Sequence, residues 1–214
     1  MKSSNVLRFI ESGILIAVAT VLSLFQPFQL PFGGGITIVS MLPIVIVSYR
    51  YGVKWGIFTG FTYSLLMMAT GYSTVRGLFL PDDDGGSINI IRALLIIFLD
   101  YICAYTMLGI GGLFRNKFKA ATGLCLGAIA ALTARYIVHI ISGAVFYGAW
   151  AEWFFTQEGF YKAGDVIMDN FSGKSLAIIY SVFYNGLYMI PEIILTAIAA
   201  YFIGKIPYIT RKKQ

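Results

Sequence analysis

Residues 118–146 read FKAATGLCLGAIAALTARYIVHIISGAVF, a stretch in which only Lys119 and Arg135 carry a full charge. About 20 apolar residues in a helix are enough to cross the hydrocarbon core of a membrane. Inside a membrane the backbone satisfies its hydrogen bonds only in a helix or in a closed barrel. The run is much longer than a barrel strand of about 9–11 residues. It therefore predicts a membrane-spanning helix.

The composition of the whole chain extends this prediction to the rest of the molecule. Hydrophobic residues make up 58% of the 214 residues and charged residues 12%, against about 45–50% and about 25% in soluble domains. We expect an all-α integral membrane protein, a single domain over residues 1–214 that forms a bundle of six transmembrane helices. The predicted spans are 7–25, 36–50, 55–72, 89–114, 118–146 and 175–203. The second is short and contains Pro43, so we expect it to be broken or strongly packed.

The placement of Lys and Arg tests the number of spans, because these residues accumulate on the cytoplasmic side. The N-terminus, the turn between spans two and three, the turn between spans four and five, and the C-terminus lie on the same face of the membrane only if the number of spans is even. These four segments hold eleven basic residues: Lys2, Arg8, Arg50, Lys54, Arg115, Lys117, Lys119, Lys205, Arg211, Lys212 and Lys213. The opposite face holds four basic residues and seven acidic ones. This asymmetry predicts a multi-pass protein of the cell membrane with both termini in the cytoplasm. Basic residues scattered over short turns do not form a nucleic-acid surface, so no nucleic-acid partner is expected.

Several catalytic and metal-binding motifs are absent from the sequence. Gly173-Lys174-Ser175 resembles the end of a phosphate-binding loop, but Met168 occupies the position where that motif needs a glycine. A nucleophilic Ser142 beside His139 lacks the usual glycine two residues earlier, where Ile140 stands. One histidine and two separated cysteines do not predict a transition-metal site. We expect no enzymatic activity, no catalytic residues, no metal and no cofactor.

Ionisable side chains inside membrane spans are costly and usually face the bundle interior or a cavity. Four occur here: Asp100, Arg135, His139 and Glu192. Arg135 and His139 share one helix stripe with Gly143 and Tyr147, since residues four apart lie on the same face. Each has a plainer interpretation. His139 could hydrogen-bond a neighbouring helix, Arg135 could pair with Asp100 or Glu192, and Glu192 could serve backbone groups freed by the preceding proline.

Together these residues describe a pocket. The segment 180–186, YSVFYNG, adds tyrosines and an asparagine. A carboxylate and aromatic faces both attract a desolvated cation, the latter by about 2 kcal/mol each. The pattern indicates a site for a flat, polar, cationic ligand, in which a few polar groups fix orientation.

The sequence resembles a known family, the thiamine-specific S-components of energy-coupling factor (ECF) vitamin transporters. The resembling segments follow one another along nearly the whole chain: GGGIT at 33–37 with SMLP at 40–43, YRYGVKWG at 49–56, LDY at 99–101, RYIVH at 135–139 with Ser142-Gly143, and Tyr180-Ser181 with Tyr184-Asn185-Gly186.

The resemblance implies a six-helix subunit that captures thiamine in an outward-facing pocket. It also implies docking on a shared ECF transmembrane subunit with two ATPase subunits that energise uptake. The ligand-binding positions that it implies are Asp100, Tyr101, His139, Gly143, Tyr147, Tyr180 and Asn185. Asp100 and Asn185 would take the polar groups of the aminopyrimidine and the hydroxyethyl thiazolium, while His139 and Tyr147 would stack on the rings. In the family, small residues of the first helix face the shared subunit. In this chain the corresponding residues are Gly13 and Ala17. Small residues four positions apart also permit close packing within a helix bundle.

The sequence also departs from the family pattern. Some relatives have tryptophan at the position of Tyr147 and another in the first loop, and Thr74 stands where some have a tyrosine that contacts the ligand. Residues 76–87 look like an insertion. We expect Trp150, Trp153, Phe28 or Phe32 to supply the missing aromatic surface. Three alternatives stay open: the same architecture binding another flat heterocycle, such as a pyrimidine precursor or a related vitamin; an intramembrane enzyme acting through His139 and Ser142; and a purely structural subunit.

Overall fold

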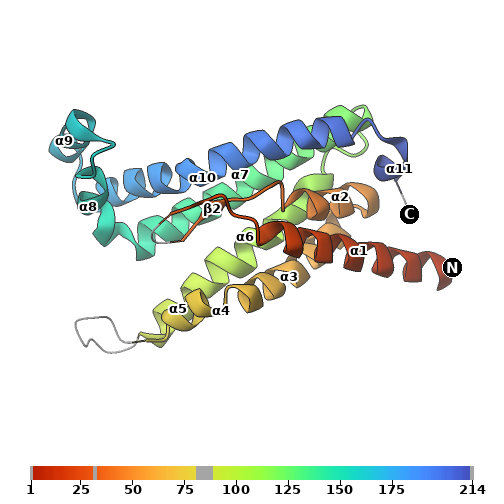
Figure 1. Cartoon of the computed structure of the whole chain (residues 1–214), viewed down its shortest axis with the longest axis horizontal. Helices are drawn as coiled ribbons and strands as arrows, with labels where there is room; N and C mark the ends of the chain where they lie inside the picture. The colour runs from red at the N-terminus through yellow and green to blue at the C-terminus, as the bar shows by residue number, and fades with distance from the viewer. Residues whose placement is uncertain (1, 31–32, 81–88, 213–214) are drawn as a thin grey trace.

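The computed structural model describes residues 2–30, 33–80 and 89–212. It is a bundle of long helices with a short hairpin laid against it (Figure 1). The first half contains α1 (Lys2–Ser23), β1 (Phe28–Gln29), β2 (Gly35–Ile36), α2 (Leu42–Tyr51), α3 (Val53–Thr70) and α4 (Tyr72–Gly77). The second half contains α5 (Ile90–Ile96), η1 (Ile97–Cys103), α6 (Ala104–Thr106), η2 (Met107–Gly112), α7 (Ala120–Phe146), η3 (Gly148–Trp150), α8 (Ala151–Phe155), α9 (Tyr161–Asn170), α10 (Gly173–Ile203) and α11 (Pro207–Thr210).

Four helical segments of the described chain are long and apolar enough to cross a membrane: Asn5–Ser23, Ile90–Gly112, Ala120–Phe146 and Gly173–Ile203. They overlap four of the predicted spans. The predicted class, a helical membrane protein, is confirmed. The helix α3 overlaps the predicted span 55–72 and is 18 residues long, which corresponds to about 27 Å at 1.5 Å per residue. It contains Lys54 and three threonines and is not among the four segments above.

The predicted span 36–50 is not one regular helix, in line with the expectation that it is broken or strongly packed. Residues Gly35–Ile36 form a strand, and α2 begins only at Leu42 and is ten residues long. Pro43 lies in its first turn, where a proline is tolerated, and a proline disfavours helical geometry in the residue before it. Nine of its ten residues are buried. At about 15 Å, α2 is a half-length helix packed inside the bundle.

The predicted span 89–114 is helical but is not one regular α-helix. Its middle, η1, is a π-helix of seven residues that contains Asp100, and its end, η2, is a 3₁₀-helix. Short π-helical segments widen the backbone locally and occur mostly at functional sites. Here the widened turn carries the one carboxylate of the span.

Glycines allow the inner helices to approach very closely. A Cβ atom at Gly127 of α7 would overlap the carbonyl oxygen of Gly111 in η2, and one at Gly109 would overlap the backbone of Ile57 in α3. In this way η2 lies in direct backbone contact with helices on two sides. The hydroxyl of Ser48 in α2 donates to the carbonyl of Gly109 and accepts from the N–H of Gly112 at 2.8 Å. Small residues and interhelical hydrogen bonds of this kind stabilise helix packing in membranes.

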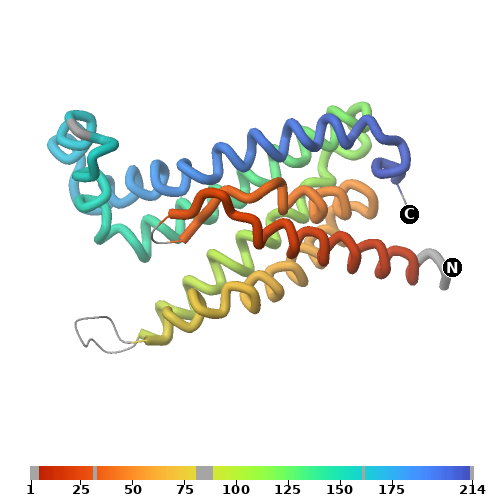
Figure 2. Tube along the Cα trace, viewed as in Figure 1, coloured from red at the N-terminus to blue at the C-terminus, as the bar shows by residue number. Residues whose placement is uncertain are grey.

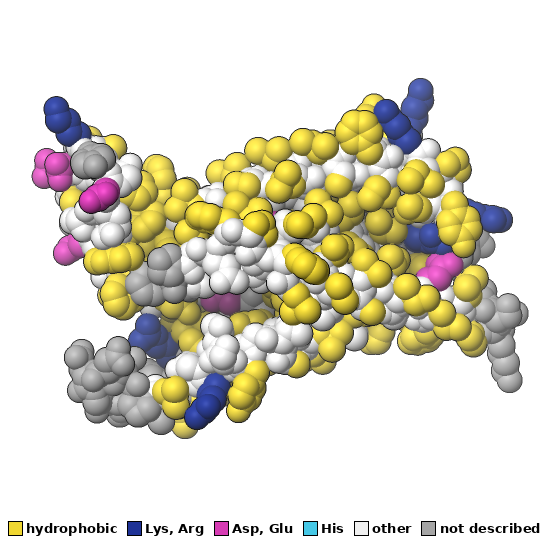
Figure 3. Space-filling model, viewed as in Figure 1, with side chains coloured by type: hydrophobic (Ala, Val, Ile, Leu, Met, Phe, Trp, Pro, Cys, Tyr) yellow, Lys and Arg dark blue, Asp and Glu magenta, His cyan; other side chains and the backbone are white. Residues whose placement is uncertain are grey.

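Large hydrophobic side chains cover the outside of the bundle (Figure 3). On α1 they include Phe9, Ile14 and Val21, each more than half exposed. On α10 they include Ile178, Ile194 and Ile198, also more than half exposed. A soluble protein rarely exposes so large a contiguous apolar surface. The exposed faces therefore fit contact with lipid.

Basic segments that are distant in sequence meet at one end of the bundle, where both termini lie (Figure 2). Arg50 at the end of α2 forms an ion pair with Glu11 of α1 at 2.8 Å and donates to the carbonyl of Ile209 at 3.2 Å. Arg115 donates to the carbonyl of Arg50 at 2.9 Å. The four basic segments of the sequence thus lie on one side. On the face shown in Figure 3, acidic side chains gather over α8 and α9 at the opposite end.

The close backbone contact at Gly127 generates a stability prediction. Gly127→Ala should lower the stability of the folded protein by about 1–3 kcal/mol, the usual cost of overpacking, and so lower the melting temperature in detergent. Gly13→Ala is the matched control, since a Cβ there meets nothing within 4 Å and both changes improve helix propensity equally. Equal melting temperatures for the two variants would contradict the packing described here.

Candidate functional site

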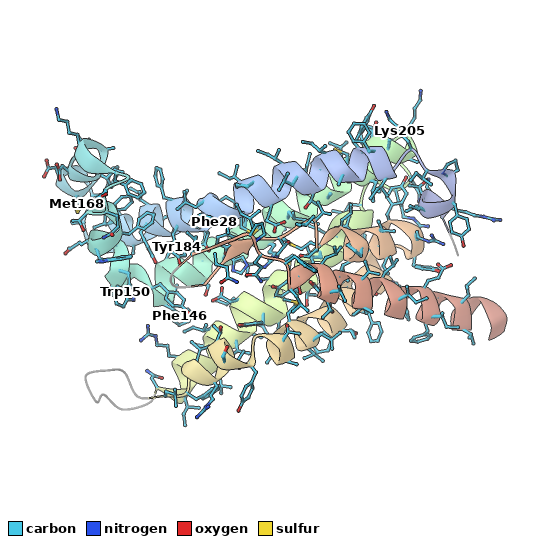
Figure 4. The ribbon with its side chains drawn as sticks, viewed as in Figure 1. Phe28, Phe146, Trp150, Met168, Tyr184 and Lys205 are labelled. Atoms are coloured by element: carbon cyan, nitrogen blue, oxygen red, sulfur yellow. The ribbon has the colours of Figure 1, made fainter. Side chains whose placement is uncertain are left out.

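The structure contains a cavity of about 600 Å³ between the hairpin and the ends of α3, η1, α7 and α10. It lies in the half of the bundle remote from the two termini, beneath the hairpin in Figure 4. All of the predicted ligand positions line it: Asp100, Tyr101, His139, Gly143, Tyr147, Tyr180 and Asn185. The structure therefore brings together residues from three separate spans. Their binding of a ligand stays a prediction.

Asp100 is the centre of the polar groups in this cavity. Its Oδ1 faces Nδ1 of His139 at 3.0 Å, and its Oδ2 accepts a hydrogen bond from the hydroxyl of Ser142 at 2.8 Å. Both partners lie on α7, one turn apart, so α7 holds the carboxylate that η1 presents. Each carboxylate oxygen has a further lone pair. Asp100 can therefore still accept hydrogen bonds from a ligand.

His139 is held from two sides. Arg135, one turn away on α7, donates from Nε to Nε2 of His139 at 3.2 Å. The guanidinium of Arg135 also lies over the ring of Tyr105, 4.2 Å from its centroid, and donates to the sulfur of Met41. The prediction that Arg135 pairs with Asp100 is wrong, because His139 lies between these two side chains. Glu192 interacts with Arg135 electrostatically.

One wall of the cavity is the tyrosine-rich face of α10. Tyr180 and Tyr184 have ring centroids 5.5 Å apart. Further along the helix, the hydroxyl of Tyr188 donates to Oδ1 of Asn185 at 2.7 Å, and Tyr188 lies edge-on to His139 with centroids 6.0 Å apart. The amide nitrogen of Asn185 donates to the carbonyl of Ser181 at 2.9 Å. Asn185 is thus oriented by its own helix before any ligand is present.

The hairpin and the segment after it cover the cavity. Gly34 has a φ of +87°, and a Cβ there would overlap the ring of Tyr188; only glycine combines this backbone conformation with so close an approach. Tyr184 donates to the carbonyl of Gly33 at 3.1 Å. Glu192 accepts hydrogen bonds from both the backbone N–H and the hydroxyl of Thr37. Glu192 therefore holds the segment after the hairpin against α10. The sequence alone did not identify this role of Glu192.

Tyr147 follows the last residue of α7 and lines the cavity. Burial raises the pKa of its phenol, and the negative charge of Asp100 raises it further. The phenol therefore remains protonated at neutral pH. It can donate a hydrogen bond as well as offer its ring.

Sequence reasoning missed part of the cavity. Tyr188, Tyr105 and the hairpin residues line it but were not predicted, and Tyr184 was expected in the pocket only as part of segment 180–186; the periodicity of α10, with tyrosines at 180, 184 and 188, was the signal available. Among the described residues, Trp150, Trp153 and Phe28 are not part of its lining, so the expectation that one of them replaces the aromatic groups of relatives is wrong for these three. Figure 4 shows Trp150 near the end of α7, at the edge of the bundle. Phe32 lies outside the described residues.

Thr74 lines the cavity from α4. Of the predicted insertion at 76–87, residues 81–87 lie outside the described part of the chain. Arg76 and Gly77 are the last residues of α4, and residues 78–80 follow it.

The predicted docking pair, Gly13 and Ala17, lies on the outer face of α1. Both residues are exposed, and nothing comes within 4 Å of a Cβ placed at Gly13. Packing within the bundle is therefore not their role. They form a smooth strip on a surface of larger apolar side chains.

The geometry does not suit a serine nucleophile. Ser142 is fully buried and donates to Asp100, while Nε2 of His139 accepts from Arg135. A nucleophilic serine needs its hydroxyl within reach of a free base. His139 has no free nitrogen with which to remove a proton from Ser142.

Comparison with known proteins gives a consistent result. The family model described as "Thiamine transporter protein" matches residues 9–80 and 86–153. The thiamine transporter ThiT of Bacillus subtilis is 30% identical over 209 residues, which cover 92% of this chain and 90% of the relative. ThiT of Lacticaseibacillus paracasei is 27% identical over 157 residues, 66% of this chain and 69% of the relative. A solved structure of ThiT from Listeria monocytogenes has the same fold, with a TM-score of 0.67 over 96% of this chain and 98% of that chain at 20% identity.

The contact between Glu192 and Thr37 generates a second stability prediction. Glu192→Ala leaves the buried N–H of Thr37 without an acceptor, whereas the hydroxyl of Thr37 can still donate to the hydroxyl of Ser40 at 2.7 Å; the lost acceptor should cost about 1–3 kcal/mol. Glu192→Gln keeps an acceptor oxygen and removes the same charge, so it is the matched control and should be the more stable variant. Thermal unfolding in detergent measures the difference. If both variants unfold at the same temperature, the hydrogen bonds to Thr37 do not stabilise the protein.

Proposed function

The chain belongs to the thiamine transporter family, a family of transporters and not of enzymes, and from this premise we propose that it is the thiamine-binding subunit of an ECF-type uptake system. The observation that supports this most directly is the cavity around Asp100, in which an acidic side chain is surrounded by tyrosines.

The chemistry of thiamine suits this cavity. Thiamine has a permanently positive thiazolium, a flat aminopyrimidine and a hydroxyethyl group. A volume of about 600 Å³ is within the usual range of about 300–1,000 Å³ for small-molecule sites. Asp100 offers negative charge, and the rings of Tyr147, Tyr180 and Tyr184 offer faces on which a cation is stabilised. Asp100 and Asn185 take the polar groups of the ligand, Tyr101 and Gly143 complete the wall, and His139 and Tyr147 stack on its rings.

The orientation in the membrane is part of the proposal. The chain crosses the membrane six times, with α2 as a half-length element, and both termini lie in the cytoplasm. The cluster of basic segments around Arg50 supports this, because such residues collect on the cytoplasmic side. The cavity lies in the opposite half of the bundle and therefore opens to the outside of the cell membrane.

Energy for uptake comes from partners. The sequence contains no phosphate-binding loop of the usual type, so we propose that a shared transmembrane subunit and two ATPase subunits supply it. Gly13 and Ala17 on the outer face of α1 form the contact with the shared subunit. Small residues at such a surface allow two helices to approach closely.

The first test is the binding of thiamine to the purified protein, measured by equilibrium dialysis or by quenching of tryptophan fluorescence. Asp100→Asn removes the charge that attracts the cation, and His139→Ala removes a stacking partner; each should weaken binding by more than about 1 kcal/mol. Asp165→Asn, an exposed acidic residue on α9, is the matched control and should bind normally. Unchanged affinity in both site variants would place the ligand elsewhere, and a competition panel of flat heterocycles would reveal a different preferred ligand.

The second test separates binding from docking. Ala17→Trp places a large ring on the exposed strip of α1 and should abolish thiamine uptake by cells that contain the partner subunits, while thiamine binding by the isolated variant stays unchanged. Val18→Trp, next to it and already a large exposed side chain, should retain more of the uptake. Normal uptake by the Ala17 variant would rule out this surface as the contact.

A further inference from the structure

Arg135 is a buried cation whose contacts lie within the site. Its side chain is 8% exposed, its Nε donates to Nε2 of His139 at 3.2 Å, and its guanidinium lies 4.2 Å from the centroid of the Tyr105 ring. Arginine is costly in a membrane interior. A position held on three sides, by His139, Tyr105 and Met41, indicates a specific task.

The hydrogen bond from Arg135 defines the protonation state of His139. A guanidinium only donates, and it does not lose its proton in proteins. Nε2 of His139 must therefore offer its lone pair and carries no hydrogen. In a neutral imidazole the hydrogen is then on Nδ1, which faces Oδ1 of Asp100 at 3.0 Å. The contact from His139 to Asp100 is a neutral N–H donating to a carboxylate.

We propose that Arg135 is a positioning residue that keeps His139 neutral, with its hydrogen on Nδ1, so that the negative charge of Asp100 is left for a cationic ligand. A protonated imidazolium would form an ion pair with Asp100 inside the protein. The carboxylate would then be neutralised before the ligand arrives. Arg135 prevents this for two reasons. A doubly protonated imidazole has no lone pair to accept the hydrogen bond from the Nε–H of Arg135, and the two adjacent cations would repel each other.

The groups around His139 restrict what else can titrate. The charged and titratable side chains that line the cavity from the elements packed against it are Asp100 and Tyr101 on η1, Tyr105 on α6, Arg135 on α7, Tyr147 at the end of α7, and Tyr180, Tyr184, Tyr188 and Glu192 on α10. Tyrosines ordinarily titrate near pH 10 and arginine higher. Of these side-chain types, the imidazole is the one whose ordinary pKa lies between about pH 5.5 and about pH 8.

The first experiment uses the fact that the chain has a single histidine. Nitrogen-15 chemical shifts of histidine-labelled protein, purified without a histidine tag, report the ring of His139 alone. We expect Nδ1 to be protonated and Nε2 unprotonated at every pH from about 8 to about 5.5, a range in which an unrestrained imidazole gains a proton. Arg135→Met, similar in length and without a donor, should let the ring become doubly protonated within that range. Arg135→Lys retains a cationic donor and should preserve the neutral ring.

Two results would overturn the proposal at this stage. One is a wild-type ring that carries its hydrogen on Nε2 or is doubly protonated at neutral pH. The other is a ring in Arg135→Met that stays neutral throughout. Arg76→Met, an exposed arginine on α4, is the matched control and should behave as wild type. The wild-type spectrum decides the tautomer even if the Arg135→Met variant does not fold.

The second experiment rests on the proposed function and measures thiamine affinity against pH. In wild type and in Arg135→Lys, the affinity should change little between about pH 8 and about pH 5.5. Arg135→Met should bind at least about tenfold more weakly at the lower pH than at the higher, because the protonated His139 pairs with Asp100. A merely structural role would weaken binding equally at every pH, and that result would overturn the link to Asp100. If wild type shows the expected tautomer but binds no thiamine, the proposed function fails and the role of Arg135 in holding His139 stands.

Discussion

A carboxylate inside an apolar bundle has to be compensated, and the interior of this protein is arranged around that requirement at Asp100. Its two oxygens face His139 at 3.0 Å and Ser142 at 2.8 Å, both of them on α7. Neither contact cancels the charge, because Ser142 is neutral and His139 is held in its neutral form by Arg135. The partners satisfy hydrogen bonds and leave negative charge in a cavity lined by tyrosines. The remaining negative charge gives the cavity a physical reason to favour a cation.

The backbone around Asp100 is irregular for reasons that lie in its packing. A π-helical turn presents the carboxylate, and the following 3₁₀ turn is rich in glycine and lies directly against α3 and α7. Close contact on two sides compensates for the weaker hydrogen bonding of these turns. On the other side of the cavity, Gly34 lies against Tyr188 and Thr37 is bound by Glu192. The same glycines and buried polar groups that would destabilise an ordinary helix bundle thus shape its cavity.

The outer surface has a different character from the interior. Large apolar side chains on α1 and α10 fit contact with lipid, whereas Gly13 and Ala17 interrupt them with a smooth strip. Basic side chains gather near the two termini, and acidic ones appear over α8 and α9 at the other end. The cavity and the smooth strip therefore lie on different parts of the molecule. The proposed ligand site and the proposed docking surface therefore do not overlap.

Length and apolarity along the sequence determined the membrane class, the long helices and the list of costly polar residues, because a bilayer requires long apolar segments whatever their neighbours are. The spacing of Arg135, His139 and Gly143 placed them on one face of α7, with Tyr147 directly after its end, for the same local reason. The short α2, the π-helical turn at Asp100 and the hairpin over the cavity were decided by the tertiary structure, since they depend on how closely glycines let distant segments approach. The bonds from Arg135 to His139 and from Glu192 to Thr37 belong to this second class as well. Local sequence shows that such buried groups need partners, and only the packing of helices selects which partners they find.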